Sequence, residues 1–296
     1  MDADLDLLLI AVFCTADDLL LVKSYNARRI VTDAEVVTLC VAQAIMGITS
    51  DPRFIAVAAK RLAHLFPRIP KRSGFYNRRE RLSDTIEALI DEFARHSAGY
   101  TDTVLLVDST PVETCRSRET VKRGGASSLD DALANAADYG YCASHSRYFY
   151  GFRLHALFAC DGTPRALALT SPKVGERDVA LALLARVQRT GHLVVIGDKG
   201  YAAKGFTADA ATLDATIGRP RRKDEGGHGP HLAPIRQRIE SIFWTAKDIL
   251  TIERHGARTL HALRTRLVCR FAAMAAAIAL NHRLRRPPRA LSAYCA

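Results

Sequence analysis

The order of strand-type and helix-type segments after residue 100 constrains the fold of this chain more than any other feature of its sequence. Short β-type runs come first, at residues 103–107, 149–159 and 165–169, and Asp161-Gly162 is typical of a tight hairpin turn between the last two. Helices and strands then alternate: helical spacing at 178–187, a β-type run at 193–196, helical spacing at 208–213, a short strand at 215–217 and a long helix from about Pro234. This order predicts an α/β fold whose mixed five-stranded sheet has an antiparallel meander feeding parallel strands, with flanking helices.

The first 96 residues show no such alternation. Apolar residues recur there at helical spacing, at residues 33–46, 54–65 and 79–93. We therefore expect an all-α domain over residues 1–98, an α/β domain over 99–284 and a basic flexible tail over 285–296. Residues 116–148 are polar and poor in β-branched residues, which predicts a loop insertion with one short helix.

The charge balance indicates a polyanionic partner. The chain has 42 Lys and Arg against 31 Asp and Glu, a formal net charge of +11, and such a field attracts nucleic acid. A membrane surface is the alternative, but no apolar run reaches the ~18 to 20 residues of a spanning helix. The acidic residues 1–6 are unlike a basic secretory leader. We expect a cytoplasmic protein without membrane association, whose seven scattered cysteines are free thiols.

A basic segment at residues 66–81 interrupts the helical half of the chain. It places cations beside Tyr76 at the entrance of a helix, which favours a helix-turn-helix-like surface that contacts DNA. The candidate DNA-binding residues in this segment are Arg68, Lys71, Arg72, Arg78 and Arg79. The alternative is a solvated basic face that contacts nothing specific.

Two aspartates end two of the predicted strands. Asp108 follows the run at 103–107, and Asp198 follows the run at 193–196. The carboxyl ends of parallel neighbours meet at one edge of an open sheet, and two carboxylates there repel each other unless a cation lies between them. Oxygen ligands without Cys or His favour Mg²⁺ or Mn²⁺ over Zn²⁺. For either aspartate alone, a simple turn residue is the alternative.

A third acid comes from the predicted helix at residues 235–250. Its apolar residues share one sector, and Arg236, Glu240 and Lys247 form a stripe beside that sector. A carboxylate there can reach a metal ion while the two cations contact phosphates. The alternative is an ordinary surface ion pair between Arg236 and Glu240, worth ~0.3 to 0.5 kcal/mol.

Further candidates follow from position on the predicted elements. Lys199 and a basic cluster of Arg219, Arg221, Arg222 and Lys223 are candidates for contacting phosphates, although a solvated loop is the alternative for the cluster. Arg153 and His155 alternate on one face of their strand and are candidates to face the metal, against a packed histidine. Trp244 lies outside the apolar sector of its helix and is a candidate to stack on an unpaired base, against simple packing.

These motifs, taken in order, resemble those of the DDE-type insertion-sequence transposases, most closely the family of insertion sequence nine-eight-two, over nearly the whole chain. Residues 107–112 (VDSTPV) resemble that family's first-aspartate strand, 150–155 (YGFRLH) its second strand, and 197–201 (GDKGY) its second-aspartate motif. The Arg236, Glu240 and Lys247 spacing is similar to the signature around its third acid, and residues 65–74 to its helical N-terminal segment. Ala233 departs from the pattern, because related transposases have a tyrosine there; Tyr201 or a loop residue is our candidate to take over its phosphate contact.

The resemblance implies a ribonuclease H-like fold and two Mg²⁺ or Mn²⁺ ions per active site. Asp108 would bridge both ions, and Asp198 and Glu240 would each complete one coordination sphere. Water would free a 3′-hydroxyl at the element's end, and this hydroxyl would attack target DNA. The implied partners are double-stranded DNA, as the terminal inverted repeats and the target, and a second copy of the chain in a homodimer. The implied location is the prokaryotic cytoplasm, at the nucleoid.

Two rival functions share most of these features. A metal-dependent nuclease of the same fold would hydrolyse nucleic acid without strand transfer. A catalytically inactive DNA-binding repressor would bind DNA only, although the complete set of acids argues against it. A glycosidase also uses paired carboxylates, but the basic charge and the 7% aromatic content argue against a sugar-binding platform.

Overall fold

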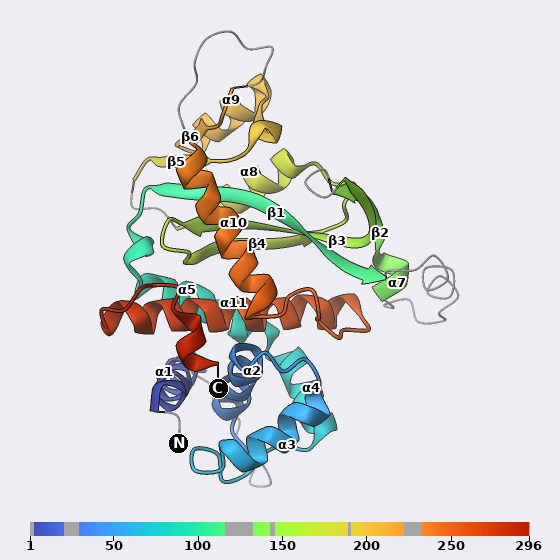
Figure 1. Cartoon of the computed structure of the whole chain (residues 1–296), viewed down its shortest axis with the longest axis vertical. Helices are drawn as coiled ribbons and strands as arrows, with labels where there is room; N and C mark the ends of the chain where they lie inside the picture. The colour runs from blue at the N-terminus through green and yellow to red at the C-terminus, as the bar shows by residue number, and fades with distance from the viewer. Residues whose placement is uncertain are drawn as a thin grey trace. The chain divides into compact units, whose positions relative to one another are not determined.

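The structure is a computed structural model, and it describes residues 3–20, 30–115, 133–142, 146–188, 191–221 and 232–295. The chain forms two compact units (Figure 1). One unit combines residues 1–97 with 245–296, and the other comprises residues 98–244. We call them the helical unit and the sheet unit.

The sheet unit contains a six-stranded mixed sheet. Its strands are β1 (Val104–Cys115), β2 (Asp138–Cys142), β3 (Arg147–Ala159), β4 (Pro164–Thr170), β5 (Leu193–Ile196) and β6 (Ala215–Gly218). The order is β2-β3-β1-β5-β6, with β4 also pairing with β3; β1, β3 and β4 are antiparallel neighbours, whereas β1, β5 and β6 are parallel. This confirms the predicted α/β class and the antiparallel meander that feeds parallel strands. The predicted number of five strands is wrong, because β2 adds a sixth.

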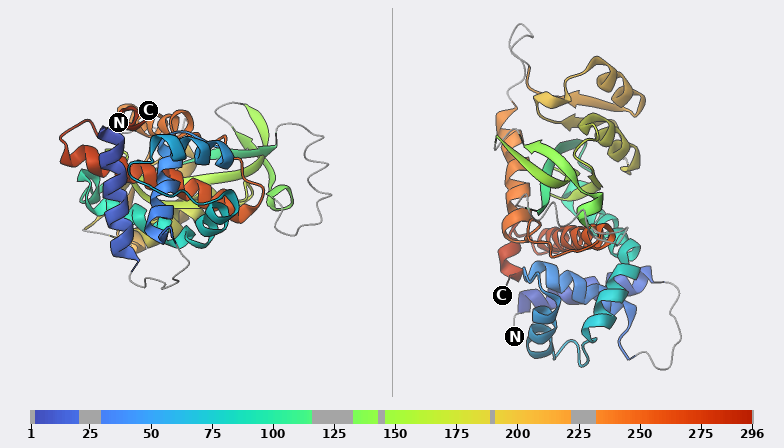
Figure 2. Two further views of the ribbon diagram at one scale, coloured as in Figure 1. Left: turned by 90° about the horizontal axis from the view of Figure 1, so that it is seen from below. Right: turned by 90° about the vertical axis from the view of Figure 1, so that its right-hand side faces the viewer.

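Helices cover both faces of this sheet. They are α7 (Leu133–Ala136), α8 (Glu176–Arg186), α9 (Lys204–Thr212) and α10 (Ala233–Asp248). Leu105 and Val107 of β1 point toward α8 and share its apolar core. Helix α10 runs along the opposite face of the sheet (Figure 2). There the rings of Phe158 and Phe243 meet edge to face with centroids 5.5 Å apart. Successive β1 side chains therefore alternate between the α8 face and the α10 face.

Strand β2 corrects the prediction of a loop over the whole of 116–148. Residues 138–142 pair antiparallel with 147–151, so the ribbon begins well inside the predicted insertion. The physical reason is side-chain pairing across the ribbon: Tyr139 packs on Tyr150 and Tyr141 on Tyr148. Residues 116–132 and 143–145 of the predicted insertion lie outside the described residues. Strand β1 also runs further than the predicted 103–107.

The helical unit takes helices from both ends of the chain. They are α1 (Ala3–Leu19), α2 (Asp33–Ile45), α3 (Asp51–Arg61), α4 (Arg72–Arg81), α5 (Ser83–Arg95) and α11 (Leu260–Arg283). A capping box starts α2, where Thr32 accepts from the backbone of Glu35 and the Glu35 carboxylate accepts from the Thr32 backbone. Helix α11 packs on α5 and α2 and is buried along most of its length. Helix α11 therefore belongs to the same unit as the N-terminal helices. This division of the chain differs from the domain boundaries expected after residues 98 and 284.

The expected flexible tail is packed instead. Leu291 and Tyr294 are fully buried, and the Tyr294 hydroxyl donates to the Asn281 side chain at 2.7 Å. The Asn281 amide in turn donates to the Pro288 carbonyl at 2.9 Å. Two buried apolar side chains and satisfied polar groups hold residues 285–295 against the helical unit. In the described part of the chain, every helix is too short or too polar to cross a membrane.

Candidate active site

The strand register brings Asp108 and Asp198 to equivalent positions. Val104, Leu105 and Leu106 of β1 pair in parallel with residues 194–196 of β5, and continuing this register places Asp108 opposite Asp198. Asp108 also pairs with Ala156 of β3, on the face that packs against α10. Backbone amides fix both carboxylates: Ser109 donates to Asp108 at 2.7 Å, and Gly200 donates to Asp198 at 2.7 Å. The two aspartates therefore lie on one face of two adjacent strands, with Asp198 just after the end of β5. Asp108 lies within β1, which continues to Cys115, so the prediction that this strand ends at Asp108 is wrong.

Helix α10 supplies the third acid to the same face. Ile239, Ile242 and Phe243 are buried against the sheet, and Glu240 is exposed beside them. The stripe that the sequence predicts therefore lies at the boundary between core and solvent.

The electrostatics of Asp108 show that these groups act on one another. The pKa of Asp108 is raised to about 6, mainly by burial and in part by the negative charges of Asp198 and Glu240, while the Ser109 amide and Arg236 act to lower it. A carboxyl group in this environment is held partly protonated near neutral pH unless a cation offsets its neighbours. Four of the predicted site residues, Asp108, Asp198, Glu240 and Arg236, are thus close enough to interact.

The donor set fits a hard divalent cation in chemistry and in charge. All three acids offer carboxylate oxygens, and the charges of Asp198 and Glu240 add to the effect of burial in raising the pKa of Asp108. Among the described residues, no group of three His, Cys, Asp or Glu side chains is arranged to hold an ion as placed. Coordination by all three acids therefore requires their side chains to move closer together.

Tyr201 lies in the core beneath the aspartates. Only 1% of it is exposed, and Gly197 makes room for its ring, because a Cβ on Gly197 would lie 2.6 Å from the ring. Its buried hydroxyl has no hydrogen-bond partner among the described atoms, and burial, with the Asp108 and Asp198 charges, raises its pKa far above the usual value. As placed, Tyr201 supports the site from below and does not contact DNA, which corrects its prediction as a phosphate ligand.

Arg153 and His155 lie on the other face of the sheet. His155 pairs with Ser109 in the β1–β3 register, one residue out of phase with Asp108. Arg153 contacts Glu176 of α8 and donates to the Tyr141 carbonyl at 2.9 Å. The His155 ring lies 3.1 Å from the Thr170 hydroxyl, and burial and Arg153 lower its pKa to about 4. The prediction that both face the metal is therefore wrong, because strand alternation turns them toward α8.

The remaining candidates in the sheet unit and along α10 differ in accessibility. Lys199 is exposed, and Trp244 is 64% exposed. Lys247 forms an ion pair with Glu253 at 3.1 Å. Arg219 donates to the Pro220 carbonyl and Arg221 is exposed, whereas Arg222 and Lys223 lie outside the described residues.

The basic segment of the helical unit divides into two groups. Arg68, Lys71 and Arg72 are exposed and available to a ligand. Arg78 donates to Asp33 at 2.6 Å and to the Val31 carbonyl, and Arg79 is 1% exposed and bonded to Asp51. The prediction that Arg79 contacts DNA is wrong, because its guanidinium is enclosed in the helical core.

The β2–β3 ribbon presents an aromatic surface that the sequence analysis missed. Its tyrosines stack in cross-strand pairs, Tyr139 with Tyr150 at 4.9 Å and Tyr141 with Tyr148 at 5.1 Å between ring centroids. Tyr148 is 79% exposed. By strand alternation, Tyr148 and Tyr150 share the face of β3 that carries Ala156, the partner of Asp108. The spacing of two tyrosines two residues apart, repeated on both arms, was the available signal. We call these four residues the tyrosine ladder.

The site therefore combines carboxylates from two adjacent strands of a mixed sheet with a third carboxylate on the covering helix. Comparison with known proteins specifies the family. Residues 99–276 match the family model described as "Transposase DDE domain", which covers more than half of the chain. The chain belongs to this family, and it is a DDE-type transposase. Transposase DDE domains generally use divalent metal ions, and the family implies catalysis of DNA cleavage.

Other comparisons add little. No curated protein matches this chain. One similar solved structure is described as "Crystal structure of a pre-cleavage Mos1 transpososome"; it has 13% sequence identity and a TM-score of 0.26, and the match covers 84% of this chain and 79% of that one. A likeness this remote adds nothing to the family assignment.

Proposed function

We propose that this transposase binds the ends of its own element, cleaves them and joins them to target DNA at a single active site formed by Asp108, Asp198 and Glu240. The observation that carries the proposal is the register of β1 and β5, which places Asp108 opposite Asp198 on the face covered by α10, where Glu240 lies close enough for its charge to act on Asp108. Three acids in such proximity are stable in their ionised form only with a cation between them.

The carboxylates of Asp108, Asp198 and Glu240 would hold two Mg²⁺ or Mn²⁺ ions. A pair of divalent ions supplies activation of the attacking oxygen and stabilisation of the leaving oxygen at a phosphodiester. Arg236 lies near Asp108 and would orient the scissile phosphate. Water would attack first, and the freed 3′-hydroxyl would attack the target in the second step. Neither step needs a covalent bond between protein and DNA, so no serine or tyrosine nucleophile is required.

DNA would be positioned by exposed cations outside the acidic centre. Lys199 and Arg221 in the sheet unit, and Arg68, Lys71 and Arg72 in the helical unit, are accessible to a phosphate backbone. Trp244 and the tyrosine ladder would contact bases that unpair near the cut. Joining two element ends to one target requires two active sites, and we propose a homodimer in the DNA complex.

The test is cleavage and strand transfer on a labelled duplex that carries the element's own ends. Wild type, Glu240→Gln and the control Asp209→Asn, which removes an exposed acid of α9, are compared in Mg²⁺, Mn²⁺, Ca²⁺ and EDTA. We expect wild type and Asp209→Asn to nick and join only with Mg²⁺ or Mn²⁺, and Glu240→Gln to bind DNA but do neither.

The other outcomes identify the rival functions. Metal-dependent hydrolysis without joining would favour a nuclease of the same fold. Tight binding without cleavage in any metal would favour a repressor. Full activity of Glu240→Gln would remove Glu240 from the active site.

A further inference from the structure

A pocket of about 600 Å³ opens in the helical unit, away from the three acids. Its walls come from the start of α3, the start of α4, and residues 256–266 before and within α11. Three arginines line it, Arg72, Arg258 and Arg266, against one acid, Asp51. Ser73, Tyr76 and Asn77 of α4 add further polar groups.

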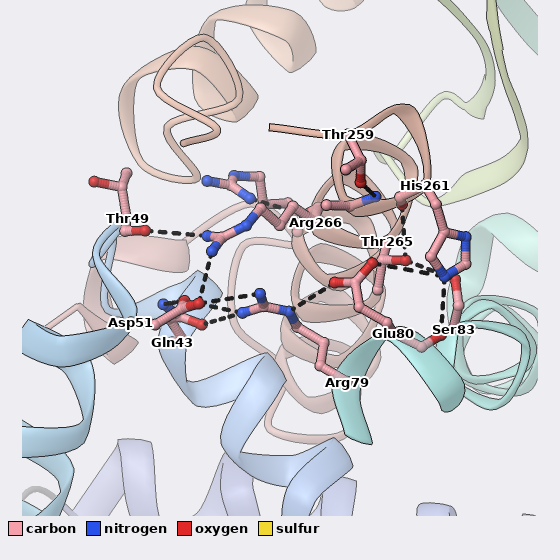
Figure 3. A network of polar contacts seen from close by, with 12 residues as sticks. Gln43, Thr49, Asp51, Arg79, Glu80, Ser83, Thr259, His261, Thr265 and Arg266 are labelled. Atoms are coloured by element: carbon pink, nitrogen blue, oxygen red, sulfur yellow. Dashed lines mark hydrogen bonds and ion pairs between the residues drawn. The ribbon is translucent and has the colours of Figure 1, made fainter. Parts of the chain in front are cut away.

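The one acid in the pocket wall is already engaged by buried arginines (Figure 3). Arg79 donates to both Asp51 oxygens, at 3.0 and 3.1 Å, and Arg266 donates to Asp51 Oδ2 at 2.8 Å. Burial alone would raise the pKa of Asp51, but the hydrogen bonds and charges of Arg79 and Arg266 lower it to about 2. Arg270 is also buried and donates only to backbone carbonyls, those of Leu250 and Arg266.

Positive charge is therefore in excess around this pocket. Glu80 lies beside Arg79, with its carboxylate 3.5 Å from the guanidinium. Asp51 and Glu80 are therefore paired with Arg79 and Arg266, while the nearby Arg270 contacts only backbone carbonyls. Within the described residues, neither Arg72 nor Arg258 has a side-chain partner, and both are exposed at the pocket. Buried or clustered guanidinium groups without counter-charges are costly, so an anion in the pocket would stabilise them.

Two further observations indicate that the missing partner is an oxyanion. Arg266 is 7% exposed, and its buried Nε has no hydrogen-bond partner among the described atoms. The first turn of α4 meets the pocket at Arg72 and Ser73, and the helix lacks a side-chain cap, so its leading N–H groups are free to bind an anion. Guanidinium forks and helix N-termini are the groups that bind phosphate in proteins.

We propose that this arginine pocket binds a phosphate group, and that its occupant in the working complex is a backbone phosphate of the DNA. The second half of the proposal rests on the proposed function, because only a DNA-processing role supplies that ligand. The pocket contains Arg72 of the predicted DNA-binding segment, and it gives that exposed segment a fixed anchoring point. A free phosphate or a small phosphorylated molecule would satisfy the same chemistry.

The test compares the double variant Arg72→Gln/Arg258→Gln with Arg254→Gln, an exposed arginine four residues from Arg258 that does not line the pocket. Both changes are at the surface, so folding is retained. DNA affinity is measured by titrating a labelled duplex over a range of salt concentrations. We expect the double variant to lose affinity on the order of tenfold or more and to reduce the slope of log K against log salt by about 1 to 2, and Arg254→Gln to change both far less.

A second measurement separates the possible occupants. Inorganic phosphate should raise the melting temperature of the wild type above that in chloride of matched ionic strength, and the double variant should lose this gain. A phosphate-dependent gain with unchanged DNA binding of the double variant would overturn DNA as the occupant. Equal DNA binding and equal phosphate response in all three proteins would overturn the pocket itself, whereas a wild type that binds no DNA would overturn the proposed function.

Discussion

The two units each enclose a carboxyl group in surroundings of opposite charge. In the sheet unit, burial and two neighbouring acids raise the pKa of Asp108 to about 6. In the helical unit, Arg79 and Arg266 overcome the effect of burial and lower the pKa of Asp51 to about 2. An aspartate therefore lacks an opposite charge at the site in the sheet unit, whereas an aspartate supplies the opposite charge for two arginines in the helical unit.

The difference shows how an excess of buried charge marks a ligand site in this protein. A single buried ion pair has no net charge and needs no further counter-ion, but each of these two sites has an excess of one charge. The acids of the sheet unit need a cation, and the arginines of the helical unit need an anion. The two proposed ligands differ in the same way, a metal ion at the acids and a backbone phosphate at the arginines.

The largest effect is expected from neutralising Asp51. Asp51→Asn leaves Arg79 and Arg266 buried without their main counter-charge, so it should lower the free energy of unfolding by about 3 to 5 kcal/mol at neutral pH. Because the pKa of Asp51 is lowered in the folded state, its contribution is present above pH ~4, the pKa range of the unfolded chain, and is lost as the pH falls toward 2. Urea denaturation at several pH values measures it. Asp4→Asn, which breaks the exposed pair with Arg286, is the control and should change the free energy of unfolding far less.

Ionisation of Asp108 is expected to change the stability of the protein in the opposite direction to ionisation of Asp51. Its folded-state pKa of about 6 lies above the ordinary value of 3.8, so the wild type loses stability as the pH rises from about 4 to 6 and carries the full cost above that. Asp108→Asn should remove this cost and stabilise the protein by up to about 3 kcal/mol at pH 8 in EDTA, while abolishing DNA cleavage.

Divalent metal ions sharpen this prediction. Mg²⁺ or Mn²⁺ should stabilise the wild type, because it offsets the repulsion among the acids, and should have little effect on Asp108→Asn. A destabilising Asp108→Asn substitution at pH 8 without metal would show that Asp108 is compensated by groups other than a cation, and the contrast with Asp51 would fail.

The two units are also expected to contact DNA by different physical means. Tyr148→Ala should weaken binding to a duplex with an unpaired flank by about 1 to 2 kcal/mol, because a ring that stacks on bases is lost. The salt dependence of binding should be unchanged, in contrast to the arginine pocket, because no charge is removed. Tyr148→Phe keeps the ring and is the control. A change in salt slope with Tyr148→Ala, or an equal loss with Tyr148→Phe, would contradict stacking.

Local patterns sufficed to predict the order of most strands and helices along the chain and the strands that carry the two aspartates. Asp161-Gly162 indicated the β3–β4 hairpin, and the apolar runs before Asp108 and Asp198 indicated the strands that carry them, because these signals depend on neighbouring residues. The end of the first run did not mark the end of β1, which continues past Asp108 to Cys115. The face on which each side chain lies required the register. From the sequence, His155 and Asp108 are both polar residues on adjacent strands. Only the pairing of His155 with Ser109 shows that their side chains lie on opposite faces of the sheet.

Long-range partners explain the other failures. Arg79 and Arg72 lie in the same basic run, but Asp51 and Gln43 from distant helices enclose only Arg79. The burial of α11 and of the tail likewise depends on residues more than 150 positions earlier in the chain, as in the hydrogen bonds from Arg266 to Asp51 and from Thr265 to Ser83. A single sequence carries no signal for such pairings.

The smallest expected effects are changes in the pKa of Asp108 when its charged neighbours are substituted. The two neighbours should change this pKa in opposite directions. Arg236 lowers the pKa of Asp108 and Glu240 raises it, and both act through space rather than by a direct hydrogen bond. Arg236→Gln should therefore raise the Asp108 titration midpoint and Glu240→Gln should lower it, each by less than about one pKa unit, or under ~1.4 kcal/mol. The midpoint can be followed by NMR of the side-chain carboxyl carbon in EDTA, with Asp209→Asn as a distant control. Shifts in the same direction for both variants would mean that α10 moves when it is substituted, because two opposite charges on one rigid helix must act on Asp108 with opposite signs.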